Sequence, residues 1–246
     1  MTLTLNRPAA YNSFTRPMAA LLQEGLDLAA EDNTVRCVVI TGHGKAFCAG
    51  QDLKEVTAEN APALEDIVGG SYNTTVRKMR ALSKPVITAV NGVAAGAGAN
   101  IALAGDLCVA AEDAKFIQAF SKIGLIPDSG GTWMLPKLVG LQRATALAYL
   151  GTPVAAPAAE AMGMIHRSIP TADFMEEVQV LAETLAGMPT KGLALTKQAF
   201  NRGYEQGLDA QLETEMELQG AASRTRDFQE GVAAFLEKRK PTFEGH

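Results

Sequence analysis

Residues 85–111 read PVITAVNGVAAGAGANIALAGDLCVAA and contain the pattern that decides the fold. Two runs rich in apolar residues, 85–90 and 106–111, predict strands, and the small-residue segment 97–104 between them predicts a helix. Both runs are continuously apolar rather than alternating, as in strands that are covered on both faces. A buried strand, a helix and a second buried strand predict an α/β fold with parallel crossovers.

The sequence on either side extends this pattern and then changes character. Residues 35–41 (VRCVVIT) predict another buried strand, and the apolar spacing within 18–29 predicts a helix that Thr15 caps. The polar stretch 57–73 is typical of a mobile loop beside a site. After Gly140 every periodic segment predicts a helix. These segments are 143–150, 157–162, 175–186, 191–204, 208–219 and 228–238.

The composition is that of an ordinary globular protein. Hydrophobic residues make up 47% and charged residues 20% of the 246 residues, which argues against disorder. The net charge of −5 and the pI near 5.3 argue against a nucleic-acid surface. No apolar run approaches the ~20 residues that cross a bilayer, and residues 1–8 lack the pattern of a signal peptide. We therefore expect a cytoplasmic protein that binds neither nucleic acid nor membrane.

Several familiar motifs are absent or incomplete. The three cysteines and three histidines are scattered and form no CxxC pair or clustered set, so we expect no metal site. GHGK at 42–45 lacks the Ser or Thr of a phosphate loop, and GAG at 96–98 lacks the third glycine of a dinucleotide fold. Ser121 and Ser129 lie outside a nucleophile elbow, which argues against acyl transfer through serine.

Three segments carry candidate chemistry: AFCAGQDL (46–53), NGVAAGAGA (91–99) and GLIPDSGGT (124–132). Small residues in the first two allow the backbone to approach a ligand and to direct free N–H groups at it. Two such donors that converge on one oxygen stabilise an oxyanion. By spacing alone the glycines are equally consistent with close strand-to-helix packing. In the third segment, Asp128 is either a carboxylate for acid–base work or the cap of a helix beginning at Ser129.

In order and spacing, the three segments closely resemble the crotonase (enoyl-CoA hydratase/isomerase) family, over a match from Leu3 through Gly163. The resemblance implies a ββα spiral core and a helical tail that assembles trimers or dimers of trimers. It implies a thioester carbonyl held between the backbone N–H groups of Gln51 and Ala97. Coenzyme A, a part of the substrate rather than a separate cofactor, is expected to bend around residues 49–53.

From the same resemblance we expect an acyl-CoA-binding catalytic core over 1–186 and a helical oligomerisation region over 187–246. Lys238 is expected either to reach a coenzyme A phosphate across a subunit interface or to be a solvated basic helix end. The residues expected to bind substrate or coenzyme A are Ala49, Gly50, Asp52, Leu53, Gly98, Asn100, Phe120 and Lys238.

The departures from the family pattern indicate the reaction. Family hydratases place glutamates at the positions of Asn100 and Phe120. Hydration requires one group to deprotonate water and usually a second to protonate carbon, and an amide and a phenyl ring cannot share that work. One carboxylate suffices to move a proton from beside a thioester to another carbon. We therefore expect Asp128 to be the base, with its pKa raised by burial against Phe120 and Trp133.

Within the family, AFSKIGLIPDSGGTW (119–133) and EGVAAFLEKRKPTF (230–243) are most similar to isomerases of phenylacetate degradation. Those enzymes convert ring-1,2-epoxyphenylacetyl-CoA into an oxepin-CoA and shift double bonds in unsaturated acyl-CoAs. The resemblance thus implies an acyl-CoA isomerase. Two alternatives stay open: an enoyl-CoA hydratase of phenylacetate degradation or β-oxidation, and a non-catalytic member that binds acyl-CoA.

Overall fold

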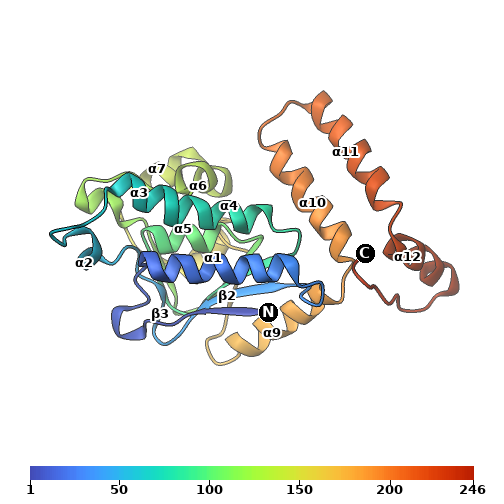
Figure 1. Cartoon of the computed structure of the whole chain (residues 1–246), viewed down its shortest axis with the longest axis horizontal. Helices are drawn as coiled ribbons and strands as arrows, with labels where there is room; N and C mark the ends of the chain where they lie inside the picture. Colours follow the sequence, from blue (N-terminus) through green and yellow to red (C-terminus); the bar gives the residue numbers. More distant parts are fainter.

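Two β-sheets form the centre of the molecule, for which a computed structural model describes all 246 residues (Figure 1). One sheet has five strands in the order β1-β2-β4-β6-β9 and is parallel throughout. The other has four strands in the order β3-β5-β7-β8, of which only β8 is antiparallel to its neighbour. The strands are β1 (Thr2–Leu5), β2 (Val38–Gly42), β3 (Ala46–Cys48), β4 (Val86–Val90), β5 (Val93–Ala95), β6 (Leu107–Ala111), β7 (Lys115–Ile117), β8 (Val154–Ala155) and β9 (Arg167–Ile169).

Three pairs of consecutive strands cross from the first sheet to the second. β2 leads into β3, β4 into β5 and β6 into β7, so each pair places one strand in each sheet. Residues 53–81, 97–103 and 156–161 return the chain from the second sheet to the first, whereas residues 16–31 connect β1 to β2 and residues 119–150 connect β7 to β8. Helical segments surround the two sheets. These are α1 (Arg16–Glu31), α2 (Leu53–Val56), α3 (Leu64–Ile67), η2 (Val68–Asn73), α4 (Thr74–Ala81), α5 (Ala97–Leu103), η3 (Ala119–Ile123), α6 (Gly131–Val139), α7 (Leu141–Leu150), α8 (Ala156–Ala161) and α9 (Phe174–Ala186), with the short turn η1 (Pro8–Ala10) before α1. The predicted α/β class and the ββα arrangement are confirmed.

The core lies between the sheets and the helices that cover them. β2 and β4 are buried almost along their whole length, which explains their continuous apolar sequences. Helix α1 begins where predicted, because the Thr15 hydroxyl accepts a hydrogen bond from the Met18 amide at 3.4 Å. Its Leu22 and Leu26 side chains are buried in the core. All three cysteines are buried and unpaired.

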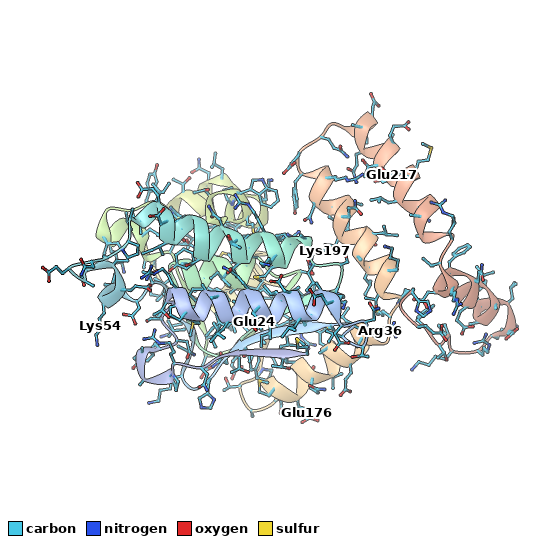
Figure 2. All side chains as sticks on the ribbon, in the orientation of Figure 1. Glu24, Arg36, Lys54, Glu176, Lys197 and Glu217 are labelled. Atoms are coloured by element: carbon cyan, nitrogen blue, oxygen red, sulfur yellow. The ribbon has the colours of Figure 1, made fainter.

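The C-terminal helices form a separate layer beside the core (Figure 1). α10 (Thr190–Gly203) and α11 (Leu208–Ala222) run side by side, and α12 (Arg226–Glu237) lies at the far end of the molecule. Lys197, which Figure 2 labels where α10 meets the core, donates to the Met79 carbonyl at 2.7 Å and pairs with Asp106 at 2.8 Å. The expected boundary at 186/187 coincides with the end of α9, and a separate oligomerisation region stays a prediction.

Two expectations about secondary structure are wrong. The chain after Gly140 is not purely helical, because β8 and β9 complete the edges of the two sheets; they have only two and three residues, too few for a periodic pattern. Residues 64–73 are not a loop, since α3 and the π-helix η2 lead directly into α4. Ser71 and Tyr72, two residues of η2, are buried.

None of the helices combines the length and apolar character required to span a bilayer.

Candidate active site

Two backbone amides without partners face the junction of β3, β5 and α5. Phe14 holds the outer edge of the first glycine turn, because its amide donates to the Gly50 carbonyl at 2.7 Å and its carbonyl accepts from the Asp52 amide at 2.9 Å. The Gln51 amide between them makes no hydrogen bond. The Ala97 amide is also unpaired, because it belongs to the first turn of α5. Both are free to donate to a ligand.

Glycine brings these two amides together. Gly50 has a φ of +93°, and a Cβ at this position would lie 2.9 Å from the Ala95 carbonyl oxygen and 3.7 Å from the Ala97 nitrogen. A Cβ on Gly98 would lie only 2.3 Å from the Cys48 carbonyl oxygen. Larger residues would therefore force the two turns apart. The close approach of the turns agrees with the predicted pair of oxyanion donors, Gln51 and Ala97, whose role stays a prediction.

Asp128 lies in the turn that precedes α6. Its carboxylate accepts a hydrogen bond from the Ser129 hydroxyl at 2.8 Å, and its backbone carbonyl accepts from the Gly131 amide at 2.8 Å. Burial raises the pKa of the carboxyl group above its usual range, while the Ser129 hydrogen bond opposes that shift. The expectation that Asp128 caps a helix is wrong, because α6 is preceded by Gly130 and its end has no side-chain cap.

Asn100 connects α5 to the Asp128 turn. Its side-chain amide donates to the Asp128 carbonyl at 2.9 Å and its oxygen accepts from the Gln118 side chain at 2.8 Å. Asn100 is completely buried, and a Cβ on Gly131 would lie 2.2 Å from its amide nitrogen. Both polar atoms of the Asn100 side chain are thus bonded inside the protein, and one of them holds the backbone of the Asp128 turn.

Phe120 and Trp133 do not lie together beside Asp128. The Phe120 ring is buried beside the glycine turns, since its Cζ would lie 3.9 Å from a Cβ on Gly96. Trp133 turns instead toward the tail, where its ring packs against Tyr204 at 5.0 Å and against the Lys137 ammonium at 3.3 Å. The expectation that Trp133 flanks Asp128 is therefore wrong, since α6 directs this side chain into a cleft of about 360 Å³ lined in part by α10.

The turn expected to bind coenzyme A is stabilised by side-chain contacts of Asp52. The Asp52 carboxylate accepts from the Lys54 amide at 3.1 Å and so caps α2. It also pairs with Arg7 at 2.8 Å, and this hydrogen bond is the main cause of its lowered pKa. Leu53 is exposed. Asp52 therefore fixes the turn, and Arg7 is a contributor that the sequence alone does not single out.

Lys238 is the one residue of the expected site that lies far from the two glycine turns. It follows α12 with a left-handed φ of +54°. Figure 1 places α12 and α2 at opposite ends of the longest axis of the molecule, and Figure 2 labels Lys54 of α2 at the end away from the tail. Within one chain Lys238 is thus remote from the glycine turns, and a contact across a subunit interface stays a prediction.

Tyr72 is a site residue that the sequence reasoning missed. Its ring is fully buried against Phe14, with centroids 5.6 Å apart, and its hydroxyl donates to the Gln51 side-chain oxygen. Burial raises its pKa, and the negative charge of Asp128 adds to that shift. The available signal was a large aromatic residue in an otherwise polar stretch.

The arrangement combines one half-buried carboxylate with a pair of unpaired backbone amides. A carboxylate whose pKa is raised is a stronger base than an ordinary carboxylate, and two free amides stabilise the negative oxygen that forms when a carbon beside a carbonyl group loses a proton. The class of site is therefore one for removal of a proton beside a carbonyl group, the chemistry that the family resemblance implies for an acyl thioester.

Comparison with known proteins agrees with this class. Residues 1–246 match the family model described as enoyl-CoA hydratase/isomerase, and the chain belongs to that family. It is 50% identical to a 1,2-epoxyphenylacetyl-CoA isomerase from Escherichia coli, over 100% of this chain and 95% of the relative. It is 43% identical to a probable enoyl-CoA hydratase from Rhodobacter capsulatus, over 99% and 93% of the two chains.

The fold has close counterparts among solved structures. The enoyl-CoA hydratase from Bacillus anthracis superimposes with a TM-score of 0.95 at 34% identity, over 100% of this chain and 95% of the other. The predicted family, the crotonase-type fold and the prediction of an enzyme of the hydratase/isomerase type are confirmed.

Proposed function

We propose that this enzyme isomerises acyl-CoA thioesters through an enolate, with ring-1,2-epoxyphenylacetyl-CoA as its principal substrate. The observation that carries the proposal is one half-buried carboxylate, Asp128, whose pKa is raised by desolvation and whose turn is held by Asn100 of α5. The 50% identity to the Escherichia coli isomerase supports the choice of substrate. A shift of the double bond in unsaturated acyl-CoAs follows from the same chemistry.

In the proposed mechanism, the thioester oxygen accepts hydrogen bonds from the Gln51 and Ala97 amides. Asp128 removes a proton from the carbon beside the carbonyl, and the electron pair moves onto the oxygen. Asp128 then returns the proton to another carbon of the conjugated system, so that the enzyme ends in its starting state. In the epoxide, the bond between the two ring carbons that carry the oxygen also opens, with its electron pair entering the new double bonds, and the ring expands to the oxepin without a change in composition. No second acid or base is required, in keeping with Asn100, whose side chain is bonded within the protein.

A hydratase is the competing function, because several relatives, such as the one from Rhodobacter capsulatus, carry that name. Hydration needs a group that activates water, and the family resemblance implies that hydratases have glutamates where this chain has Asn100 and the buried Phe120.

The test is a product analysis with the purified protein. Ring-1,2-epoxyphenylacetyl-CoA, a 3-enoyl-CoA and crotonyl-CoA are supplied separately, and the products are separated by liquid chromatography and identified by mass. We expect conversion of the first two without a change in mass. Fast gain of one water by crotonyl-CoA, with no isomerisation, would assign the enzyme to the hydratases.

The proposal extends to assembly and location. Phe235 and Leu236 on α12 are 83% and 74% exposed in the single chain, which supports a tail that packs on neighbouring subunits. We therefore propose a homotrimer or dimer of trimers in the cytoplasm, with coenzyme A entering only as part of the substrate. Light scattering on the purified protein distinguishes these assemblies from a monomer.

A further inference from the structure

The Gln51 side chain lies between two groups of different hydrogen-bonding ability. Its amide nitrogen donates to the Glu55 carboxylate at 2.9 Å, and Glu55 is held in turn by Arg16 at 3.2 Å. A carboxylate only accepts hydrogen bonds, so the orientation of the Gln51 side chain is determined: nitrogen toward Glu55, oxygen toward Tyr72. The Tyr72 hydroxyl must therefore donate its proton to Gln51.

This direction decides what Tyr72 can do. Its only proton is engaged by Gln51, so the hydroxyl does not donate to Asp128 and leaves the base free to accept a proton. Burial and the charge of Asp128 both raise the pKa of Tyr72, so the hydroxyl stays protonated throughout the neutral range. Tyr72 is thus a permanent donor rather than an acid or base.

We propose, on the basis of the proposed function, that Tyr72 is a positioning residue for the oxyanion hole. Its hydroxyl fixes the side chain of Gln51, and Phe14, which its ring contacts, holds the backbone on both sides of Gln51. Together these contacts restrain the peptide whose N–H points at the thioester oxygen. The residue therefore acts on catalysis through Gln51 without touching the substrate.

The local backbone supports this role. Tyr72 lies in a π-helix, a rare conformation that occurs often at functional sites. Gln23 on α1 stabilises this turn, because its side-chain nitrogen donates to the Gly70 carbonyl at 3.0 Å and to the Ser71 carbonyl at 3.1 Å. The widened turn buries Tyr72 next to Phe14 and the first glycine turn.

A double-mutant cycle tests the proposal. Tyr72→Phe, Gln51→Ala and the double variant are compared with the wild type by kcat and KM, using whichever thioester reaction the wild type catalyses. Tyr149→Phe, at a residue that is 76% exposed, is the matched control. Each single variant is expected to lower kcat by about 10-fold to 100-fold at little change in KM, since small misplacements of a catalytic group have effects of this size. The double variant is expected to lose no more than either single variant, because both changes remove the same restraint.

Other outcomes would overturn the proposal. One is a double variant whose loss equals the product of the two single losses. Another is a Tyr72→Phe variant with wild-type kcat and only a lower melting temperature, the result for a merely structural hydroxyl. A wild type that hydrates crotonyl-CoA but does not isomerise would refute the proposed function while the cycle still tests Tyr72. A wild type without any activity on thioesters would overturn both.

Discussion

Gly98 is the point of closest backbone contact between α5 and β3, and its replacement by alanine tests the oxyanion hole without removing a polar group. The new Cβ would lie 2.3 Å from the carbonyl oxygen and 2.8 Å from the carbonyl carbon of Cys48, whereas ordinary contact begins at 3.4 Å. The helix and the strand must therefore part by about 1 Å. Because the donor Ala97 directly precedes Gly98 and the donor Gln51 lies three residues after Cys48, this movement is expected to separate the two donor amides.

The expected loss follows from that displacement. Removal of one oxyanion donor typically lowers kcat by about 10² to 10³, or ~3 kcal/mol in the activation free energy. Overpacking costs about 1–3 kcal/mol of folding stability, of which the better helix propensity of alanine offsets up to ~1 kcal/mol. We therefore expect kcat of Gly98→Ala to fall by about 10²-fold. Its free energy of unfolding is expected to fall by no more than about 3 kcal/mol.

The assay is steady-state turnover of the epoxide with thermal unfolding measured in parallel. Gly105→Ala is the matched control, because its Cβ would lie 2.8 Å from the Thr88 hydroxyl oxygen, just beyond the other end of α5. This variant is expected to lose stability while it keeps kcat near that of the wild type. If Gly98→Ala loses stability and retains wild-type kcat, the donor assignment is wrong.

Two further predictions concern charge. Ser129→Ala removes the hydrogen bond that lowers the pKa of Asp128, so the carboxyl group keeps its proton to higher pH. The acid limb of the pH profile of kcat/KM is therefore expected to move to higher pH. An acid limb at the wild-type pH would contradict the role of Asp128 as the base. Asp106→Ala leaves the buried Lys197 ammonium without its carboxylate, which costs about 3 kcal/mol of unfolding free energy. Lys197→Met is expected to cost less in urea unfolding, and equal losses would argue against an uncompensated charge.

The parts of the fold that the sequence predicts are those with long, uninterrupted patterns. The continuous apolar runs of β2 and β4 identify buried strands, and α1 has both a capping residue and helical spacing. The sequence pattern alone did not reveal the strands of the second sheet, because β3, β5 and β7 have three residues each. Such short strands form because neighbouring strands pair with them, an effect that no local pattern records.

The residues of the site likewise fall into those that the sequence predicts and those that it does not. Motif resemblance locates Gln51, Ala97 and Asp128, because backbone turns of this kind need small residues at fixed spacing. Contacts between distant elements are different: Tyr72 meets Gln51 only because a π-helical turn rotates it inward, and Trp133 points to α10 because α6 determines its direction. These directions depend on tertiary packing, which a single sequence does not reveal.

Asp128→Asn tests the central claim most directly, since asparagine keeps the size of the side chain and can still accept the Ser129 hydrogen bond. The measurement is turnover of ring-1,2-epoxyphenylacetyl-CoA together with exchange of the proton beside the thioester carbonyl in deuterated water, with folding checked by circular dichroism. We predict that both rates fall by about 10²-fold to 10⁴-fold in a folded protein, as expected for the loss of a general base. Near-wild-type turnover and exchange would show that another group removes the proton.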